Sequence, residues 1–216
     1  MASEKSVTAV ASFHFMEGVD VDNKNNSAHK LWQEIMAMIA KQPGYHGLYY
    51  GNSLEDPSLT QLLIDWAPNA HEEFAASDDY AYVIESLNSL TSGAPNVHHL
   101  EPSSFPISPC GKAPVLELCT FYNTEPNFSD RIERFLVGST QVPVDGHYGH
   151  VWGPVVEEIQ KTPTEPKGRG AMMLIGWESR EAHYAFSTTA GYKEFVHTIL
   201  EGYNGNEWHH TVLRAY

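Results

Sequence analysis

The sequence predicts an α+β chain made of two copies of one structural unit, because a long segment occurs twice. Trp66 and Trp177 begin the clearest part of this repeat and lie 111 residues apart (177 − 66 = 111). After a gap of one residue, a histidine, a phenylalanine and a tyrosine recur 112 residues apart (183 − 71 = 112), in the pairs His71/His183, Phe74/Phe186 and Tyr80/Tyr192. A repeat of this length indicates two similar halves of about 100 residues each.

Hydrophobic periodicity and turn residues predict the order β-α-β-β-α-β in each half. In the first half we expect strands at 6–16, 44–51, 62–66 and 97–100, a helix at 27–41 capped by Ser27, and helices after a cap at Asn69. In the second half we expect strands at 115–122, 146–152, 172–177 and 207–213, and helices at 130–137 and between 178 and 200. This ferredoxin-like order gives a four-stranded antiparallel sheet with helices on one face. The other face is apolar too, so the two sheets are expected to pack on each other.

The two halves are expected to be joined by a linker. Four prolines lie within residues 101–114, which otherwise show little apolar periodicity. This composition is typical of a linker. The expected organisation is therefore a first half at 1–101, a Pro-rich linker at 102–114 and a second half at 115–216.

Regularly spaced glycines occur in the second strand of each half. Gly44, Gly47 and Gly51 are matched by a second set 102 residues later, which ends at Gly153 (153 − 51 = 102). No Lys-Ser or Lys-Thr follows, so the pattern does not indicate a phosphate loop. Glycines inside a strand predict a bulge or the close approach of another group.

Composition excludes several classes of partner. The chain has 13 Lys and Arg against 27 Asp and Glu, for a formal charge of −14. Without a basic cluster, neither nucleic acid nor an anionic membrane surface is an expected partner. Two cysteines imply no disulfide framework, and the first residues make a poor signal peptide. We therefore expect a cytoplasmic protein without a membrane span.

These features resemble the dimeric α+β barrel superfamily. The resemblance rests on the two β-α-β-β-α-β halves, an aromatic third strand in each, and helices led by Tyr80 and Tyr192. The superfamily includes the antibiotic-biosynthesis monooxygenase-like proteins, the stress-responsive A/B barrel proteins and the olivetolic acid cyclase type. The resemblance implies that both halves form one eight-stranded barrel within a monomer, while a homodimer remains open. It also implies a pocket between each sheet and its helices for a small hydrophobic, often aromatic molecule.

Three residues are candidates for acid/base chemistry. His14 is a candidate general base because the pKa of an imidazole lies near operating pH; the alternative is a histidine hydrogen-bonded on the side facing the barrel. By the resemblance, Tyr80 and Tyr192 stand where cyclase-like members place a catalytic His or Tyr. Their hydroxyl groups are candidate donors to a substrate carbonyl or enolate, and the alternative is packing in the core.

Aromatic residues are the candidates for the wall of the pocket. This expected substrate-binding set consists of Tyr49, Trp66, Phe74, Trp152, Trp177 and Phe186. The chain has no P-loop, no dinucleotide-binding GxGxxG, no GxSxG, no HExxH and no Cys-rich zinc spacing. The sequence therefore predicts neither a cofactor nor a metal ion.

The remaining histidines are expected to be structural. His71 and His183 follow the tryptophans among acidic residues, which predicts a solvent-facing position. His147 and His150 are three residues apart in a strand, so they are expected on opposite faces. For the same reason, at most one histidine of each adjacent pair, 98–99 and 209–210, should face inward.

These observations favour a cofactor-independent enzyme that acts on a small hydrophobic, oxygenated metabolite, in secondary metabolism. The expected chemistry is cyclisation, isomerisation or elimination by proton transfer, as in a lyase or an isomerase. Two alternatives remain open: a cofactor-free monooxygenase of an aromatic or polyketide substrate, and a binding or stress-response protein that catalyses nothing.

Overall fold

The computed structural model describes residues 5–108 and 110–216, so residues 1–4 of the expected first half and residue 109 of the expected linker lie outside it. The first half contains β1 (Val7–His14), α1 (Ser27–Ala40), β2 (Tyr45–Ser53), β3 (Leu59–Trp66), α2 (Ala70–Ala75), α3 (Asp78–Asn88) and β4 (Asn96–Leu100). The second half contains β5 (Val115–Tyr122), α4 (Phe128–Ser139), β6 (His147–Pro154), β7 (Gly170–Trp177), α5 (Arg180–Phe186), α6 (Ala190–Phe195) and β8 (Gly205–Ala215). The expected order of elements is confirmed in both halves.

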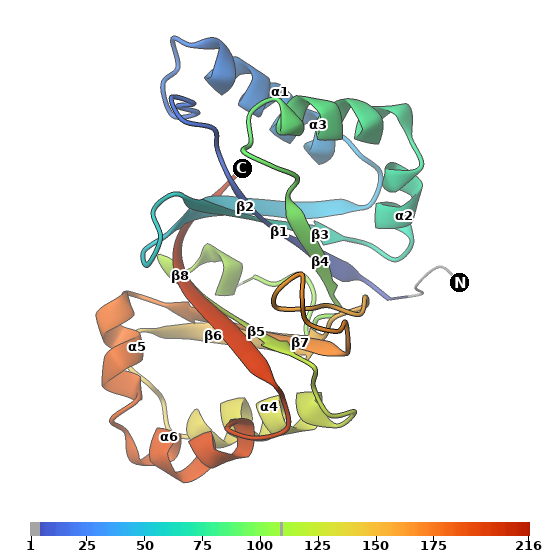
Figure 1. Cartoon of the computed structure of the whole chain (residues 1–216). Coiled ribbons are helices and arrows are strands. Elements are labelled where there is room, and N and C mark those ends of the chain that lie inside the picture. Colours follow the sequence, from blue (N-terminus) through green and yellow to red (C-terminus); the bar gives the residue numbers. More distant parts are fainter. Residues whose placement is uncertain (1–4, 109) are drawn as a thin grey trace.

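The strands of both halves form one antiparallel barrel. The strand order is β4-β1-β3-β2-β8-β5-β7-β6, so the C-terminal strand β8 joins the sheet of the first half through β2. The two ends of this order also meet, through a bridge between Leu100 and Val155 and a 2.7 Å hydrogen bond from Ser103 N to the Trp152 carbonyl. The helices cover the outer faces of the two sheets (Figure 1). The interior between the sheets is therefore separated from the two spaces beneath the helices.

Apolar residues fill all three of these layers. Val10, Leu63, Leu116 and Leu174 belong to the core between the sheets, and each is at most 2% exposed. Separate cores lie beneath the helices of each half. Every residue of β5 and β7 is buried, because these strands are covered on both faces. Such strands show near-continuous hydrophobic runs rather than alternation.

Two equivalent glycines allow the halves to approach each other. Gly51 pairs with Leu213 of β8, and a Cβ atom at Gly51 would overlap the carbonyl oxygen of Val212. A Cβ atom at Gly153 would likewise overlap the carbonyl oxygen of Glu101. The expectation of a close approach is confirmed at both positions, and the approaching group belongs to the other half.

Two helix starts differ from expectation. Helix α1 begins at Ser27, but the side chain of Asn26 caps it by accepting a 2.7 Å hydrogen bond from His29 N. Asn69 precedes α2 with a φ of 64° and makes no capping hydrogen bond. Asn69 has left-handed backbone angles rather than the extended ones of a capping residue, so its expected capping role is wrong.

The segment between the halves packs against the barrel. Ile107 and Cys110 are fully buried, and residues 110–112 form a short 3-10 turn. The buried carboxylate of Asp65 on β3 accepts a 3.1 Å hydrogen bond from Ile107 N and a 2.6 Å hydrogen bond from the Thr8 hydroxyl. Asp65 thus fastens this segment to two strands of the first half.

Replacing Asp65 by alanine should lower the free energy of unfolding by about 2–3 kcal/mol. The substitution leaves the Ile107 N–H and the Thr8 hydroxyl buried without their acceptor, and a buried unsatisfied group costs about 1–3 kcal/mol. Asp65→Asn should be less destabilising because its amide oxygen still accepts one of the two hydrogen bonds. Urea unfolding of the three proteins measures the effect. An alanine variant as stable as the parent chain would contradict the fastening role of Asp65.

Candidate functional site

Two equivalent cavities lie between the sheets and their helices. The first-half cavity has a volume of about 310 Å³, and its lining includes Ala9, Trp66, His71, Phe74 and Tyr80. The second-half cavity has a volume of about 320 Å³, and its lining includes Glu117, His183, Phe186, Tyr192 and Trp208. The repeated residues of the sequence therefore gather around both cavities.

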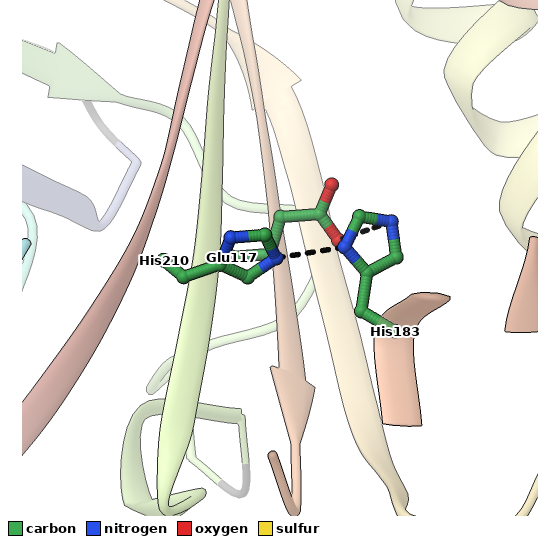
Figure 2. Close-up of side chains that lie close together, drawn as sticks. All are labelled: Glu117, His183 and His210. Carbon is green, nitrogen blue, oxygen red and sulfur yellow. Dashed lines mark hydrogen bonds and ion pairs between the residues drawn. The ribbon is translucent and has the colours of Figure 1, made fainter. Parts of the chain in front are cut away.

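A buried carboxyl group distinguishes the second-half cavity. Glu117 projects from the middle of β5, and Trp177 Nε1 donates a 2.9 Å hydrogen bond to its Oε2 atom. His183 comes from α5 and stacks on the Trp177 ring, with 5.4 Å between the ring centroids. His183 Nε2 lies 3.6 Å from Glu117 Oε2. Figure 2 shows Glu117, His183 and His210 close together beside the strands.

A chain of hydrogen bonds leads from this site to the first half. His183 Nδ1 lies 2.7 Å from His210 Nε2, and His210 Nδ1 lies 2.7 Å from Glu55 Oε1. Glu55 also accepts a 2.7 Å hydrogen bond from His210 N. Because an ionised Glu55 only accepts, His210 donates from Nδ1, and in its neutral form it accepts at Nε2 from the Nδ1–H group of His183. This assignment leaves the lone pair of His183 Nε2 on the side of Glu117.

Burial and hydrogen bonding shift the pKa values of the residues along this hydrogen-bonded chain. Burial raises the pKa of Glu117 to about 7, against the opposing hydrogen bond from Trp177. It lowers the pKa of His183 to about 4, and the neighbouring His210 adds to this shift. For Glu55, burial raises the pKa, but the hydrogen bonds from His210 outweigh it and the net pKa is lowered. At neutral pH His183 is therefore uncharged, and its contact with Glu117 is not an ion pair.

The first half contains a corresponding Glu–His–His chain without the buried carboxyl group, in which the first histidine contacts the second through Nε2 rather than Nδ1. His71 Nε2 lies 2.9 Å from His99 Nε2, and Glu157 of the second half pairs with the His99 ring and accepts a 3.0 Å hydrogen bond from His99 N. Ala9 pairs with His99 and Ile64, just as Glu117 pairs with His210 and Ile175. Ala9 thus stands where the second half has Glu117.

The comparisons with known proteins agree with this architecture. No family model and no curated protein matches the sequence. Among solved structures, a candidate monooxygenase from Lactobacillus acidophilus superposes with a TM-score of 0.64 at 10% identity, over 98% of this chain and 96% of that one. An anthrone oxidase-like protein superposes with a TM-score of 0.66 at 14% identity, over 100% and 95%. This chain has the dimeric α+β barrel fold. Identities this low establish the fold alone.

The barrel places the three predicted acid/base residues in three different cavities. His14 is exposed and lines a cavity of about 330 Å³ at the mouth of the barrel interior, where its Nδ1 lies 3.2 Å from Ser58 Oγ. Tyr80 lines the first-half cavity and Tyr192 lines the second-half cavity. His14 therefore does not meet either tyrosine, and the catalytic role of each of these residues stays a prediction.

The predicted wall residues are distributed among the layers. Trp66 and Phe74 line the first-half cavity, and Phe186 lines the second-half cavity, with Trp177 fully buried behind it. Tyr49 lies in the core between the two sheets of the barrel. Trp152 lies beside residues 101–105 at a surface hollow. Of the predicted wall residues, Trp66, Phe74 and Phe186 thus line the two helix-covered cavities, while Trp177 and Trp152 pack against the core beneath the second-half helices.

The expected positions of several histidines are wrong. His71 and His183 are partly buried in the two cavities rather than solvent-facing, because the helices turn them towards the sheets. His147 and His150 lie on one side, 3.3 Å apart between ring nitrogens, because the strand register shifts between His147 and Gly149. The adjacent pairs behave as expected, since His99 and His210 join the hydrogen-bonded chains while His98 and His209 line the barrel mouth.

The sequence reasoning missed the three glutamates of the two hydrogen-bonded clusters. Glu55 and Glu157 are 102 residues apart (157 − 55 = 102), the same spacing as the glycines of the second strands. Glu117 interrupts an otherwise apolar strand. Both signals were present in the sequence, but neither indicated which residue the carboxylate would meet.

The geometry of Glu117, His183 and His210 can be compared with that of a metal site. Ligand atoms of Glu117, His183 and His210 lie within 4.8 Å of one another, and two histidines with a carboxylate are a common metal-binding set. However, His183 Nδ1 and His210 Nε2 are 2.7 Å apart, whereas two nitrogens bound tetrahedrally to one zinc ion are about 3.4 Å apart. The two rings would have to separate to hold an ion. The expected absence of a metal stays a prediction.

No helix in the described part of the barrel is long and apolar enough to cross a membrane.

Proposed function

We propose that the second-half cavity catalyses proton transfer on a small hydrophobic, oxygenated metabolite without a cofactor. The observation that carries this proposal is Glu117, a buried carboxyl group with a raised pKa of about 7 that lines an aromatic cavity. A general acid or base works best when its pKa lies near the operating pH. Perturbed carboxyl groups in such cavities are typical of functional sites.

The neighbouring groups supply complementary roles. Glu117 removes a proton from a C–H or O–H group of the substrate and returns it at another atom. Burial and the nearby Glu117 raise the pKa of Tyr192, so its hydroxyl stays protonated and can donate to the developing oxyanion. Trp177, whose Nε1 donates to Glu117 Oε2, orients the carboxyl group, and His183, held by His210 and Glu55, lies beside it. This proposal assigns the role of base to Glu117 rather than His14, because His14 lines a different cavity.

Proton transfer of this kind leads to cyclisation, isomerisation or elimination. The product then has the mass of the substrate or is lighter by one molecule of water. The enclosed aromatic surroundings, including Phe121, Phe135 and Phe186, fit a flat, oxygenated substrate of the kind made in secondary metabolism.

A monooxygenase without cofactor is the second candidate, favoured by the descriptions of the structural neighbours as monooxygenase and anthrone oxidase-like protein. In this reaction Glu117 would take a proton from an activated methylene group, and the carbanion would react with molecular oxygen. One oxygen atom becomes the new carbonyl oxygen and the other leaves as water, so the substrate itself supplies the electrons.

A metabolite comparison distinguishes these functions. Extract of the source organism is incubated with and without the purified protein, in air and under argon, with EDTA added in parallel, and followed by mass spectrometry. We expect a compound to be consumed in both atmospheres, giving a product of equal mass or one lighter by water. Consumption in air alone, with a gain in mass from oxygen, would replace this proposal by the oxygenase. A compound that is retained unchanged would indicate a binding protein, and loss of turnover with EDTA would contradict cofactor independence.

A further inference from the structure

The two equivalent tryptophans differ in one hydrogen bond. Trp177 Nε1 donates to Glu117, whereas Trp66 Nε1 is buried and has no hydrogen-bond partner among the described residues. Trp66 is 1% exposed and stacks on Phe74, with 5.3 Å between the ring centroids. A buried N–H donor without an acceptor costs about 1–3 kcal/mol, so its retention calls for an explanation.

The missing acceptor follows from one difference between the halves. Ala9 stands at the strand position of Glu117, and its side chain ends at Cβ. Ala9, Trp66 and His71 all line the first-half cavity. The first-half cavity therefore lies against the strand position that Glu117 occupies in the second half. Because Trp66 Nε1 has almost no exposed surface, the Trp66 ring must shift for a ligand oxygen to reach it.

We propose that the first-half cavity binds a small hydrophobic carboxylic acid whose carboxyl group takes the place of the Glu117 side chain. One carboxyl oxygen accepts the hydrogen bond from Trp66 Nε1, and the group faces His71. The hydrocarbon or aromatic part of the ligand lies against Ile35, Ile64, Phe74 and Val83 of the same cavity. This site is distinct from the catalytic site proposed in the second half and does not depend on it.

The surroundings select this class of ligand. The cavity wall is mostly apolar, so an aliphatic or aromatic body is favoured over a sugar or a phosphate. An amine offers no acceptor to an indole N–H group. The second half shows that a carboxyl group can lie next to a Glu–His–His chain. There, Glu117 Oε2 is 3.6 Å from Nε2 of His183, the last histidine of the chain formed with His210 and Glu55.

Octanoate is a direct probe of this site. Isothermal titration of the full chain measures its affinity, with octylamine as the chain-matched compound that lacks an acceptor. The indole N–H signals of the five tryptophans are followed by NMR, and the Trp66 signal is assigned by its loss in Trp66→Phe. We expect octanoate to shift the Trp66 signal and Trp66→Phe to bind it at least about tenfold more weakly, as for the loss of a hydrogen bond to a charged group. Unchanged affinity in Trp66→Phe, or equal binding of octylamine, would overturn the proposal.

Reciprocal substitutions at Ala9 and Glu117 test whether the ligand carboxyl group takes the place of the Glu117 side chain. Ala9→Glu supplies a carboxyl group from the chain itself, so it should shift the Trp66 signal without ligand and abolish octanoate binding. Glu117→Ala removes the internal carboxyl group of the second half, so the stoichiometry should rise from one octanoate to two, and the Trp177 signal should now respond. The second variant remains informative if a glutamate at position 9 prevents folding. A stoichiometry that stays at one in Glu117→Ala would contradict the equivalence of the two sites.

These measurements are independent of turnover. Failure of octanoate to bind in the first half would leave the proposed acid/base role of Glu117 intact. Failure of Glu117 substitutions to affect turnover would leave the first-half binding site intact.

Discussion

Glu117→Gln should lower turnover by about 10²- to 10⁴-fold, the usual contribution of a positioned general acid or base. Glutamine keeps nearly the same shape, and its amide oxygen still accepts the hydrogen bond from Trp177 Nε1. It cannot take up or release a proton near neutral pH. The effect should therefore appear in turnover, while the cavity and its affinity for substrate are largely retained.

Single-turnover kinetics on the compound identified by the metabolite comparison measure this effect. Asp65→Asn is the matched control, because Asp65 is also a buried carboxyl group but lines neither helix-covered cavity. The control should turn over at nearly the rate of the parent chain once it is folded. If Glu117→Gln retained full activity, another group would have to be the acid or base.

The same substitution should make the protein more stable at neutral pH. Burial raises the pKa of Glu117 from 4.5 to about 7. The folded protein therefore holds the Glu117 proton more tightly than the unfolded chain does. The stability associated with this group is therefore fully present below pH 4.5 and is lost as pH rises through 7. The difference of about 2.5 pH units corresponds to roughly 3 kcal/mol, at about 1.4 kcal/mol per unit. Glu117→Gln does not ionise and avoids this loss.

Urea unfolding of both proteins between pH 4.5 and 8 tests the prediction. The stability of Glu117→Gln relative to the parent chain should rise by roughly 3 kcal/mol over this range. The lowered pKa of His183 has the opposite effect on stability between its folded value of about 4 and its ordinary 6.5, so the difference between variant and parent is the informative quantity. A difference that does not change with pH would show that folding does not raise the pKa of Glu117. Gain of stability with loss of turnover would also exclude misfolding as the cause of inactivity.

The fold was largely predictable from local patterns. The Trp66/Trp177 repeat, the order of strands and helices, and the second apolar face of each sheet together predicted two similar halves whose sheets pack on each other, and the resemblance to the dimeric α+β barrel superfamily implied the intrachain barrel. The glycines at 51 and 153 predicted a close approach because glycine lacks a Cβ atom. The local exceptions, such as the cap at Asn26 and the register shift beside His147, depend on backbone angles that side-chain patterns do not report.

The site was only partly predictable. The repeat indicated Trp177, Phe186 and Tyr192 around one cavity, and the structure places Phe186 and Tyr192 in its lining. Glu117 was missed because an isolated glutamate in a strand is ordinarily assigned to a solvent-facing side. In this barrel both faces of β5 are covered, so the same residue becomes a buried acid with a raised pKa. His183 was assigned to the surface for a similar reason, since its acidic sequence neighbours suggested solvent.

Sequence periodicity is a property of neighbours along the chain, and it was sufficient for the order of elements in the two halves, while the family resemblance implied their shared barrel. The charge state of Glu117 and the hydrogen-bonded chain of His183, His210 and Glu55 arise from contacts between distant residues. Glu55 and His210 are 155 positions apart and belong to different halves. Burial and hydrogen bonding, which determine pKa values, exist only after those halves have packed together. For this reason the tertiary structure alone decided that the second-half cavity contains the carboxyl group with the raised pKa, Glu117. It also decided that Trp66 in the first half has no acceptor for its N–H group among the described residues.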